Sequence, residues 1–317
     1  MFCWTCILFL TPQFLVFSYE IYDTSQLIQT ILLDDLLVDG KHRRIEDIAI
    51  KNYDGSLFIQ RVLKLTDISP FAVASTVLEI PPEKQNATEL DTLLLPLNHS
   101  KIMIPYIQAM AAAPFALGAV ELKKNDKIWD ILAIGLGTGI LNGFLHDVFS
   151  NMNITVIELQ QGMYEIAKKY FGLIEDNNQR IIIEDGLEYL QENANQSKFD
   201  VIFIDACYDR IVDEVICPVE AFMLKKNLKI IKETLSENGI VILSVLTFEE
   251  YKLRQIQKNY TNVFGNCHLI TDSLNHVNHV LACGESRRKK TEFARKLREI
   301  YKKFGFYSEP NVDWMHR

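Results

Sequence analysis

The sequence lacks several patterns that would assign its chemistry directly. It has no C-x-x-C pair and no His/Cys set with the spacing of metal ligands, so we expect no metal site. No repeat or low-complexity tract is present, and no apolar stretch beyond residue 18 approaches the length needed to span a membrane. What is present is a chain of 317 residues, 48% of them hydrophobic, which is enough to bury one sizeable core.

The chain also lacks the excess of positive charge that is typical of nucleic-acid binders. Lys and Arg total 33 against 41 Asp and Glu, which gives a net charge of -8. Nine basic and two acidic residues between 287 and 303 make a local charge of +7, so the rest of the chain carries -15. An acidic body does not suit nucleic acid but suits a cationic substrate such as an amine, a lysine or a basic protein partner.

Residues 1–18 contain no charged side chain, and their apolar run is too short to cross a bilayer. This pattern predicts a secretory signal peptide and a mature chain in the secretory pathway or outside the cell. The segment lacks a basic start and contains Pro12, so a buried N-terminal strand in a cytoplasmic protein is the alternative. Secretion is also consistent with five N-x-S/T sequons, which begin at Asn86, Asn98, Asn153, Asn195 and Asn259.

Four of the six cysteines follow the predicted signal peptide: Cys207, Cys217, Cys267 and Cys283. Cys267 and Cys283 would bridge in an oxidising compartment if they lie opposite each other on a hairpin, but buried free thiols are the favoured interpretation. Cys207 has no His nearby in the sequence, so we do not interpret it as a nucleophile.

From Lys127 onward, short apolar runs alternate with amphipathic stretches. This alternation predicts β-α units around a doubly wound, mostly parallel α/β sheet of the Rossmann-like type. The expected strands are Ile128–Ile134, Ile154–Leu159, Arg180–Glu184, Phe199–Asp205 and Ile240–Leu246. Between them we expect a helix over Ile140–Phe149 and a longer helix from Pro218 to about Leu235.

The C-terminal part of the sequence predicts that the parallel sheet ends in antiparallel strands. Cys267–Ile270 and His276–Cys283 are separated by turn residues, which indicates an antiparallel hairpin that closes the sheet. A parallel sheet with this ending resembles the seven-stranded sheet of class I methyltransferases. A basic amphipathic helix, Arg287–Phe304, follows the hairpin, and its charges form a solvated face.

The region before residue 115 is expected to be a small β-containing accessory region. It predicts a helix near Leu27–Leu37 and strands at Ser56–Lys64 and Phe71–Ile80. We therefore divide the chain into a signal peptide (1–18), an accessory region (19–114), a cofactor-binding domain (115–286) and a basic helix with a tail (287–317).

A glycine-rich turn follows the first strand of the predicted sheet. Gly135, Gly137 and Gly139 form a G-x-G-x-G pattern between a strand and a helix, where glycines allow positive φ and close approach of a ligand. Such a turn occurs in many α/β proteins. About twenty residues later the second strand ends in Glu158, whose carboxylate can accept hydrogen bonds from two ribose hydroxyls. Together they predict a nucleotide cofactor.

Polar residues also end the third strand. Asp185 and Gly186 stand where a carboxylate or a backbone group can hold an adenine amino group, although Asp185 is equally suited to cap the next helix.

Further polar residues follow the fourth strand, at the edge where open α/β sheets bind ligands. Asp205 can orient the cofactor's amino group or accept a substrate proton. Tyr208 or Asp209 can hold an amine, although Asp209 can equally be a solvated loop residue.

A series of segments resembles the spermidine-synthase-like C-terminal domain of the elongation factor 1-alpha lysine and N-terminal methyltransferases, a class I S-adenosylmethionine-dependent family. The segments are IGLGTGIL, VIELQQGMYEIAKKYFG, RIIIEDGLEYL, FDVIFIDACYD, CPVEAFMLKKNLKIIKETLSENGIVIL and HVLACG, and the likeness covers roughly Leu97–Glu285. It implies that the three glycines cradle the methionine part of S-adenosylmethionine, Glu158 takes the ribose, Asp185 takes the adenine and Asp205 lies beside the reacting centre.

The chain departs from the polyamine synthases, which carry an Asp in the glycine loop and Asp-Pro after the fourth strand. It has Thr138 in the loop and Tyr208-Asp209-Arg210 after the strand. We therefore expect a methyltransferase that acts on a protein or an amine. An aminopropyltransferase and a non-catalytic secreted protein that keeps the fold are the alternatives.

Overall fold

The computed structural model describes residues 27–67, 72–85, 87, 89–122, 126–194, 196, 198–210, 214–272, 278–285 and 288–312. The predicted signal peptide lies outside these residues. The N-terminal part is an antiparallel sheet in the order β1-β2-β3-β4-β5. Its strands are β1 (Leu27–Val38), β2 (Lys41–Lys51), β3 (Leu57–Lys64), β4 (Ala72–Leu78) and β5 (Leu97–Asn98).

The helix predicted near Leu27–Leu37 is wrong, because these residues form β1. Asp39 and Gly40 both have positive φ, 50° and 76°, and make a tight turn that pairs β1 with β2 over their length. Leucine-rich segments favour helix only weakly, and cross-strand pairing overrides that preference. The two strands predicted between residues 56 and 80 are confirmed as β3 and β4.

The larger sheet has nine strands among the described residues, in the order β14-β12-β13-β11-β9-β6-β7-β8 with β10 beside β11. The strands are β6 (Trp129–Ile134), β7 (Met152–Glu158), β8 (Gln179–Ile183), β9 (Phe199–Ile204), β10 (Val215–Cys217), β11 (Leu235–Thr247), β12 (Asn266–Asp272), β13 (Asn278–Gly284) and β14 (Pro310–Val312). β6, β7, β8, β9 and β11 pair in parallel, and the other pairings are antiparallel. The sheet therefore contains two short strands, β10 and β14, in addition to the seven predicted.

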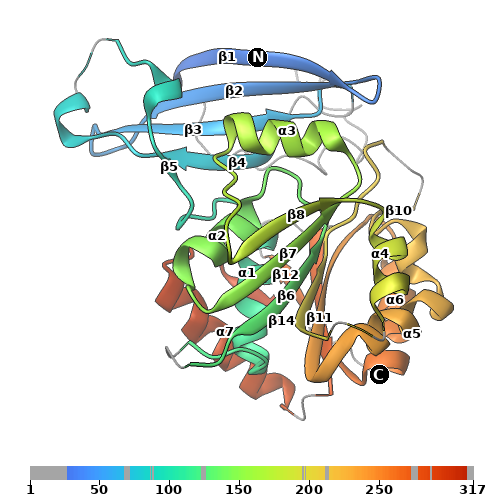
Figure 1. The fold of residues 1–317 in the computed structure, drawn as a ribbon. Helices are drawn as coiled ribbons and strands as arrows, with labels where there is room; N and C mark the ends of the chain where they lie inside the picture. Colours follow the sequence, from blue (N-terminus) through green and yellow to red (C-terminus); the bar gives the residue numbers. More distant parts are fainter. Residues whose placement is uncertain are drawn as a thin grey trace, which may run out of the picture.

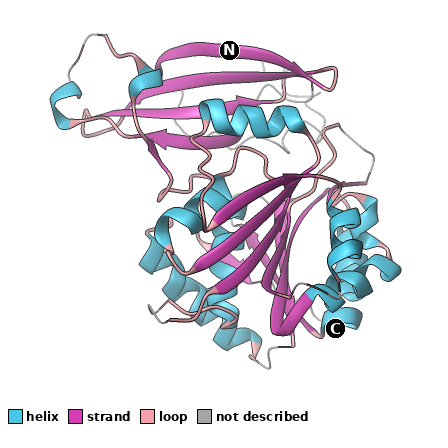
Figure 2. Ribbon diagram, viewed as in Figure 1, coloured by secondary structure: helices cyan, strands magenta, loops and turns pink. Residues whose placement is uncertain are grey.

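Helices cover both faces of this sheet, and the N-terminal sheet lies across one end of it (Figure 1). One face carries α1 (Pro105–Leu117), α2 (Ile140–Val148) and α7 (Lys290–Phe304), and the other carries α4 (Gly186–Asn193), α5 (Lys225–Thr234) and α6 (Glu250–Phe264). α3 (Gln161–Tyr170) overlaps the lower strands of the N-terminal sheet in Figure 1, and Figure 2 shows the same view coloured by secondary structure. Among the described residues no helix combines the length and apolar character needed to cross a membrane.

The helix predicted from Pro218 to Leu235 is only partly correct. Residues Glu220–Met223 form a 3-10 turn, and α5 begins at Lys225. The helix stops at Thr234 because Leu235 already pairs with Phe199 of β9. The predicted basic helix is confirmed as α7, which buries Phe293 and Leu297 and packs against α1.

The predicted C-terminal hairpin is confirmed, and it carries a disulfide. Cys267 of β12 and Cys283 of β13 stand directly opposite each other and are bonded. The preference for free thiols at these positions was wrong: register places the two side chains on the same face of adjacent strands, and the sequence alone did not fix that register.

Replacing Cys267 and Cys283 together by Ala is expected to lower the free energy of unfolding of the oxidised chain by about 3 kcal/mol, because the bond closes a 16-residue separation. Urea unfolding of the two proteins, with and without dithiothreitol, measures this. The reductant should remove most of the difference. Equal midpoints under oxidising conditions would show that this bond contributes nothing.

The N-terminal sheet is attached to the rest of the chain by buried and exposed polar contacts. Arg61 of β3 forms a two-point ion pair with Asp47 of β2, at 2.8 and 2.9 Å, and donates to the carbonyl oxygen of Tyr170 at the end of α3, at 2.9 Å. Gln160, which precedes α3, donates to Asp39 at 2.7 Å. Because the charge of Arg61 is buried and paired, these contacts fix how β2 and β3 face the larger sheet.

Candidate cofactor and acceptor site

A cavity of about 540 Å³ lies at the carboxyl ends of the parallel strands, under the N-terminal sheet. Volumes of roughly 300–1,000 Å³ are typical of small-molecule sites. Eight of the nine sequence-predicted site residues line it: Gly135, Gly137, Glu158, Asp185, Gly186, Asp205, Tyr208 and Asp209. Gly139 is the exception, because it caps α2 at φ 80° and does not line the cavity.

In the turn after β6, glycine is favoured at two positions for different reasons. Gly135 has φ 97°, and a Cβ there would collide with the backbone carbonyl oxygen of Asp205. Gly137 has φ 55°, and a Cβ there would meet no atom within 4 Å. Gly135 therefore allows β6 and β9 to approach, whereas Gly137 leaves open space at the cavity wall.

Glu158 faces this turn from the end of β7. Its Oε2 accepts from the backbone N–H of Leu136 at 2.9 Å, and its Oε1 accepts from the N–H of Gln160 at 2.8 Å. The residue is only 7% exposed, and burial raises the pKa of its carboxyl although backbone N–H groups oppose the shift. The two N–H groups fix the carboxylate at the cavity wall.

Asp185 combines the two roles considered for it. Its Oδ1 accepts from the backbone N–H groups of Leu187 and Glu188, at 2.8 and 3.2 Å, and so caps α4. Asp185 also lines the cavity, together with Gly186. A Cβ on Gly186 would collide with Ile134 of β6, so glycine is required there for packing.

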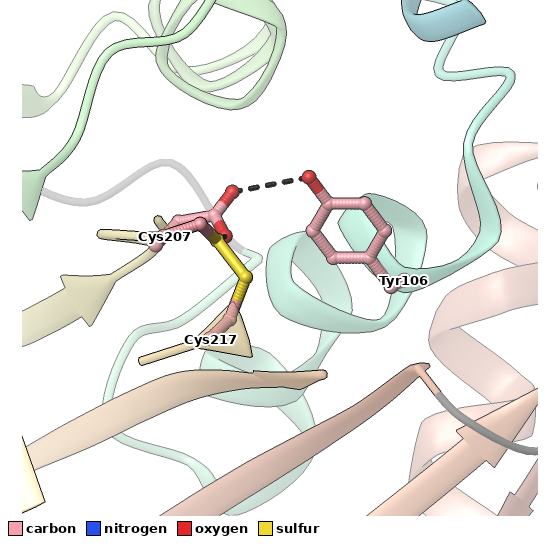
Figure 3. The surroundings of a disulfide bond; sticks show 4 residues. Tyr106, Cys207 and Cys217 are labelled. Carbon is pink, nitrogen blue, oxygen red and sulfur yellow. Dashed lines mark hydrogen bonds between the residues drawn. A yellow bond between two sulfur atoms is a disulfide. The ribbon is translucent and has the colours of Figure 1, made fainter. Parts of the chain in front are cut away.

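Asp205 lies at the floor of the cavity. It accepts a hydrogen bond from the hydroxyl of Tyr106 in α1, at 3.2 Å (Figure 3). Burial raises the pKa of the Asp205 carboxyl, while hydrogen bonds from Ser244 and Tyr106 oppose the shift. Asp205 is therefore held from two sides, by residues of α1 and β11.

A disulfide between Cys207 and Cys217 adjoins Asp205 (Figure 3). The sulfur of Cys207 lies 3.6 Å from Oδ1 of Asp205. Because Cys207 is bonded, it cannot serve as a free thiol nucleophile, in agreement with the sequence interpretation. The bond ties the loop after β9 to β10 and so to the sheet.

Asp209 is committed to two cations. Lys41 and Arg43 of β2 both form ion pairs with its carboxylate, the second at 3.2 Å. Partial burial would raise the pKa of Asp209, but the two cations outweigh it and lower this pKa. This placement does not favour the amine-binding role considered for Asp209. The neighbouring Tyr208 lines the cavity, and its hydroxyl accepts from the N–H of Glu220 at 3.2 Å.

Three cavity residues were not singled out as site residues from the sequence. Tyr106 lies within the segment that carried the family resemblance, but nothing local marked it. Arg43 comes from a strand of the accessory region, and no motif surrounds it. Thr138, noted only as a departure from the polyamine synthases, is 4% exposed, and its hydroxyl has no hydrogen-bond partner among the described residues.

Comparisons with known proteins agree with this geometry. A family model described as the spermine/spermidine synthase domain matches residues 116–276. The eEF1A lysine and N-terminal methyltransferase homolog of Drosophila melanogaster is 29% identical over 174 residues, which cover 54% of this chain and 26% of that protein. The polyamine aminopropyltransferase of Vibrio vulnificus is 27% identical over 167 residues, with 52% and 50% covered. The chain thus spans about a quarter of the first relative. The resemblance inferred from the sequence is confirmed.

Solved structures show the same fold. Human methyltransferase-like protein 13 in complex with SAH superposes with a TM-score of 0.54 at 23% identity, covering 66% of this chain and 92% of that one. A probable spermidine synthase from Corynebacterium glutamicum gives a TM-score of 0.59 at 13% identity, covering 89% and 97%. The second match covers far more of the chain than residues 116–276, so the structural likeness reaches into the N-terminal region.

Proposed function

Because the chain belongs to the spermine/spermidine synthase domain family, we propose that it is an S-adenosylmethionine-dependent methyltransferase built on the seven-stranded sheet order of class I enzymes. The observation that carries the proposal is Glu158, which is fixed by the N–H of Leu136 in the glycine turn and faces the cavity. The tips of β6, β7, β8 and β9 thereby meet at one site, which is where open α/β sheets bind nucleotides.

The cavity residues fit S-adenosylmethionine. The space beside Gly137 and the unpartnered hydroxyl of Thr138 suit the methionine part, and the Glu158 carboxylate suits the two ribose hydroxyls. Asp185 and Gly186 suit the adenine. When bound, the cofactor supplies a methyl group on a sulfonium centre. The contribution of the protein is then alignment, with Asp205 and Tyr106 at the cavity floor.

The departures from polyamine synthases favour methyl transfer over aminopropyl transfer. Thr138 replaces the loop Asp, and Asp209 is paired with Lys41 and Arg43, so neither carboxylate expected to bind a diamine is available.

Isothermal titration of the full oxidised chain with S-adenosylmethionine should give a Kd in the micromolar range. Methyl transfer from labelled donor should then appear with proteins, amines and carboxylates offered as separate acceptor pools. A parallel reaction holds putrescine and decarboxylated S-adenosylmethionine. Spermidine formation there would replace our proposal with aminopropyl transfer, and binding without turnover on any pool would favour a non-catalytic protein.

The raised pKa of Glu158 predicts a pH dependence of nucleoside binding. Only the ionised carboxylate accepts from both ribose hydroxyls, so affinity for 5′-methylthioadenosine should fall as the pH drops through the raised pKa, above the value of about 4.3 of an exposed Glu. Stability changes in the opposite direction: the Glu158 contribution is present below the ordinary pKa and is lost as the pH rises through the folded pKa.

Titrations of 5′-methylthioadenosine at several pH values, with folding followed by circular dichroism, separate the two effects. The ligand has no group that titrates between about pH 5 and 8. Glu158→Gln is the matched control and should bind weakly with no such slope. An equal slope in both proteins would remove Glu158 from the explanation.

We also propose that the chain folds in an oxidising compartment of the secretory pathway. Two disulfides support this, because such bonds are rare in reducing compartments. Expression with a C-terminal tag in secretory cells should give a protein whose thiols resist alkylation until it is reduced. Recovery of four freely alkylated cysteines from intact cells would contradict the proposal.

A further inference from the structure

The cavity extends beyond the cofactor residues into a second half, which we call the acceptor half. Its wall is apolar and comes mainly from β3, β4 and the start of α1. The wall residues are Leu63, Leu65, Ala72, Val73, Ala74, Ile104 and Ile107. These side chains offer no hydrogen bonds, so they suit the apolar part of a ligand rather than a polyamine.

Arg43 lies in the cavity lining beside this wall, and the two nearby carboxylates already have partners. Lys41, Arg43 and Asp209 form one cluster with two cations and one carboxylate. Asp205, the other carboxylate of the acceptor half, already accepts from Tyr106. The Asp209 carboxylate is therefore not free to pair with a cationic acceptor, although the protein as a whole is acidic.

Arg43 is a buried charged group of this half with an unused hydrogen-bond donor. It lines the cavity, is 1% exposed, and its Nε has no hydrogen-bond partner among the described residues. Its two terminal nitrogens donate to Asp209 at 3.2 Å and to the carbonyl oxygen of His42 at 3.4 Å, which are long bonds for a guanidinium. A buried guanidinium with an unused donor is a binding group for an oxyanion.

We infer that the acceptor is a small amphiphile with an apolar body and an anionic head, and that Arg43 binds this head. That this ligand is the methyl acceptor rests on the proposed function. The anion subsite itself requires only the cavity and Arg43. The head is a carboxylate or a phosphate, since both offer two oxygens to the fork of a guanidinium.

Four probes with the same apolar chain test the head group: octanoate, octyl phosphate, octylamine and 1-octanol. Each is titrated calorimetrically into the full oxidised chain, alone and with saturating S-adenosylhomocysteine. We expect an anionic probe to bind at least about 10-fold more tightly than octanol and octylamine not to exceed octanol. The tighter of the two anions identifies the head. Binding of octylamine above octanol, or equal binding of all four, would overturn the inference.

Two variants assign the effect to the proposed residue. Arg43→Gln should weaken the anionic probe by about 10- to 100-fold and leave S-adenosylhomocysteine binding unchanged. Asp209→Asn removes the carboxylate that competes for Arg43, so it should bind the anion several-fold more tightly. If Arg43→Gln fails to fold, Asp209→Asn still decides, because an amine site at Asp209 predicts the loss of octylamine binding and no gain for the anion.

Failure of the two proposals can be told apart. A chain that binds the anion but no S-adenosylhomocysteine would refute the methyltransferase and keep the anion subsite. A chain that binds S-adenosylhomocysteine but prefers octylamine would refute the anion subsite and keep the methyltransferase.

Discussion

Glu158→Ala is expected to weaken binding of S-adenosylmethionine by about 100-fold or more. Two hydrogen bonds to a carboxylate are lost, each with a value of about 1.5–3 kcal/mol. The substitution also removes the acceptor for the N–H groups of Leu136 and Gln160, which define the glycine turn and the start of α3. Calorimetric titration of the donor measures the loss, and thermal unfolding without the donor reports on the fold.

Glu184→Ala is the matched control. Glu184 follows the neighbouring strand β8 at the same edge of the sheet, but it does not line the cavity. The Glu184→Ala variant should bind the donor with the same affinity as the unsubstituted protein. Tight binding by Glu158→Ala, with the control also normal, would show that the donor does not use this edge and would remove the main support for the proposed function.

The cofactor half of the site was predictable because its residues are local in sequence. A strand, a glycine turn and a helix fix Gly135 and Gly137, and the parallel arrangement of strands brings Glu158 to the same edge. The period of apolar residues identified the central strands β6, β7, β8 and β9 to within two residues at each end.

The acceptor half was not predictable, because its residues come together only through tertiary contacts. Arg43 and Asp209 are separated by 166 positions, and Tyr106 and Asp205 by 99. No spacing rule links such pairs. The error over β1 had the same origin, since its helix-favouring leucines are held extended by pairing with β2. Once β1 and β2 form a hairpin, Lys41 and Arg43 are carried to the loop after β9.

The net charge of the chain and the charges at the acceptor half bear on different steps of binding. The sum over the chain is a property of its whole surface and describes how a partner approaches. A bound ligand responds instead to the few charges that face it without water between them. At the acceptor half Asp209 is paired with Lys41 and Arg43, and Asp205 accepts from Tyr106. The Nε of Arg43, which has no partner among the described residues, is therefore the charged donor left for a ligand.

Three glycine substitutions are expected to separate folding from cofactor binding. Gly135→Ala should lower the free energy of unfolding by at least about 3 kcal/mol, because φ 97° is strained for Ala and its Cβ collides with the Asp205 carbonyl oxygen. Gly137→Asn should cost less than about 1 kcal/mol, because φ 55° is a conformation that Asn tolerates and no atom lies within 4 Å.

The open space beside Gly137 is where the donor is proposed to lie, so Gly137→Asn should nevertheless weaken donor binding by about 100-fold through direct overlap. Gly40→Asn is the control: it shares a positive φ, 76°, and open surroundings, but it lies in the β1–β2 turn away from the cavity. Thermal unfolding and calorimetry of all three should give loss of both properties for Gly135→Ala, of binding alone for Gly137→Asn and of neither for Gly40→Asn. Normal donor binding by Gly137→Asn would mean that the glycine turn serves only the fold, since the same turn cannot both cradle the methionine part and accept a side chain in its place.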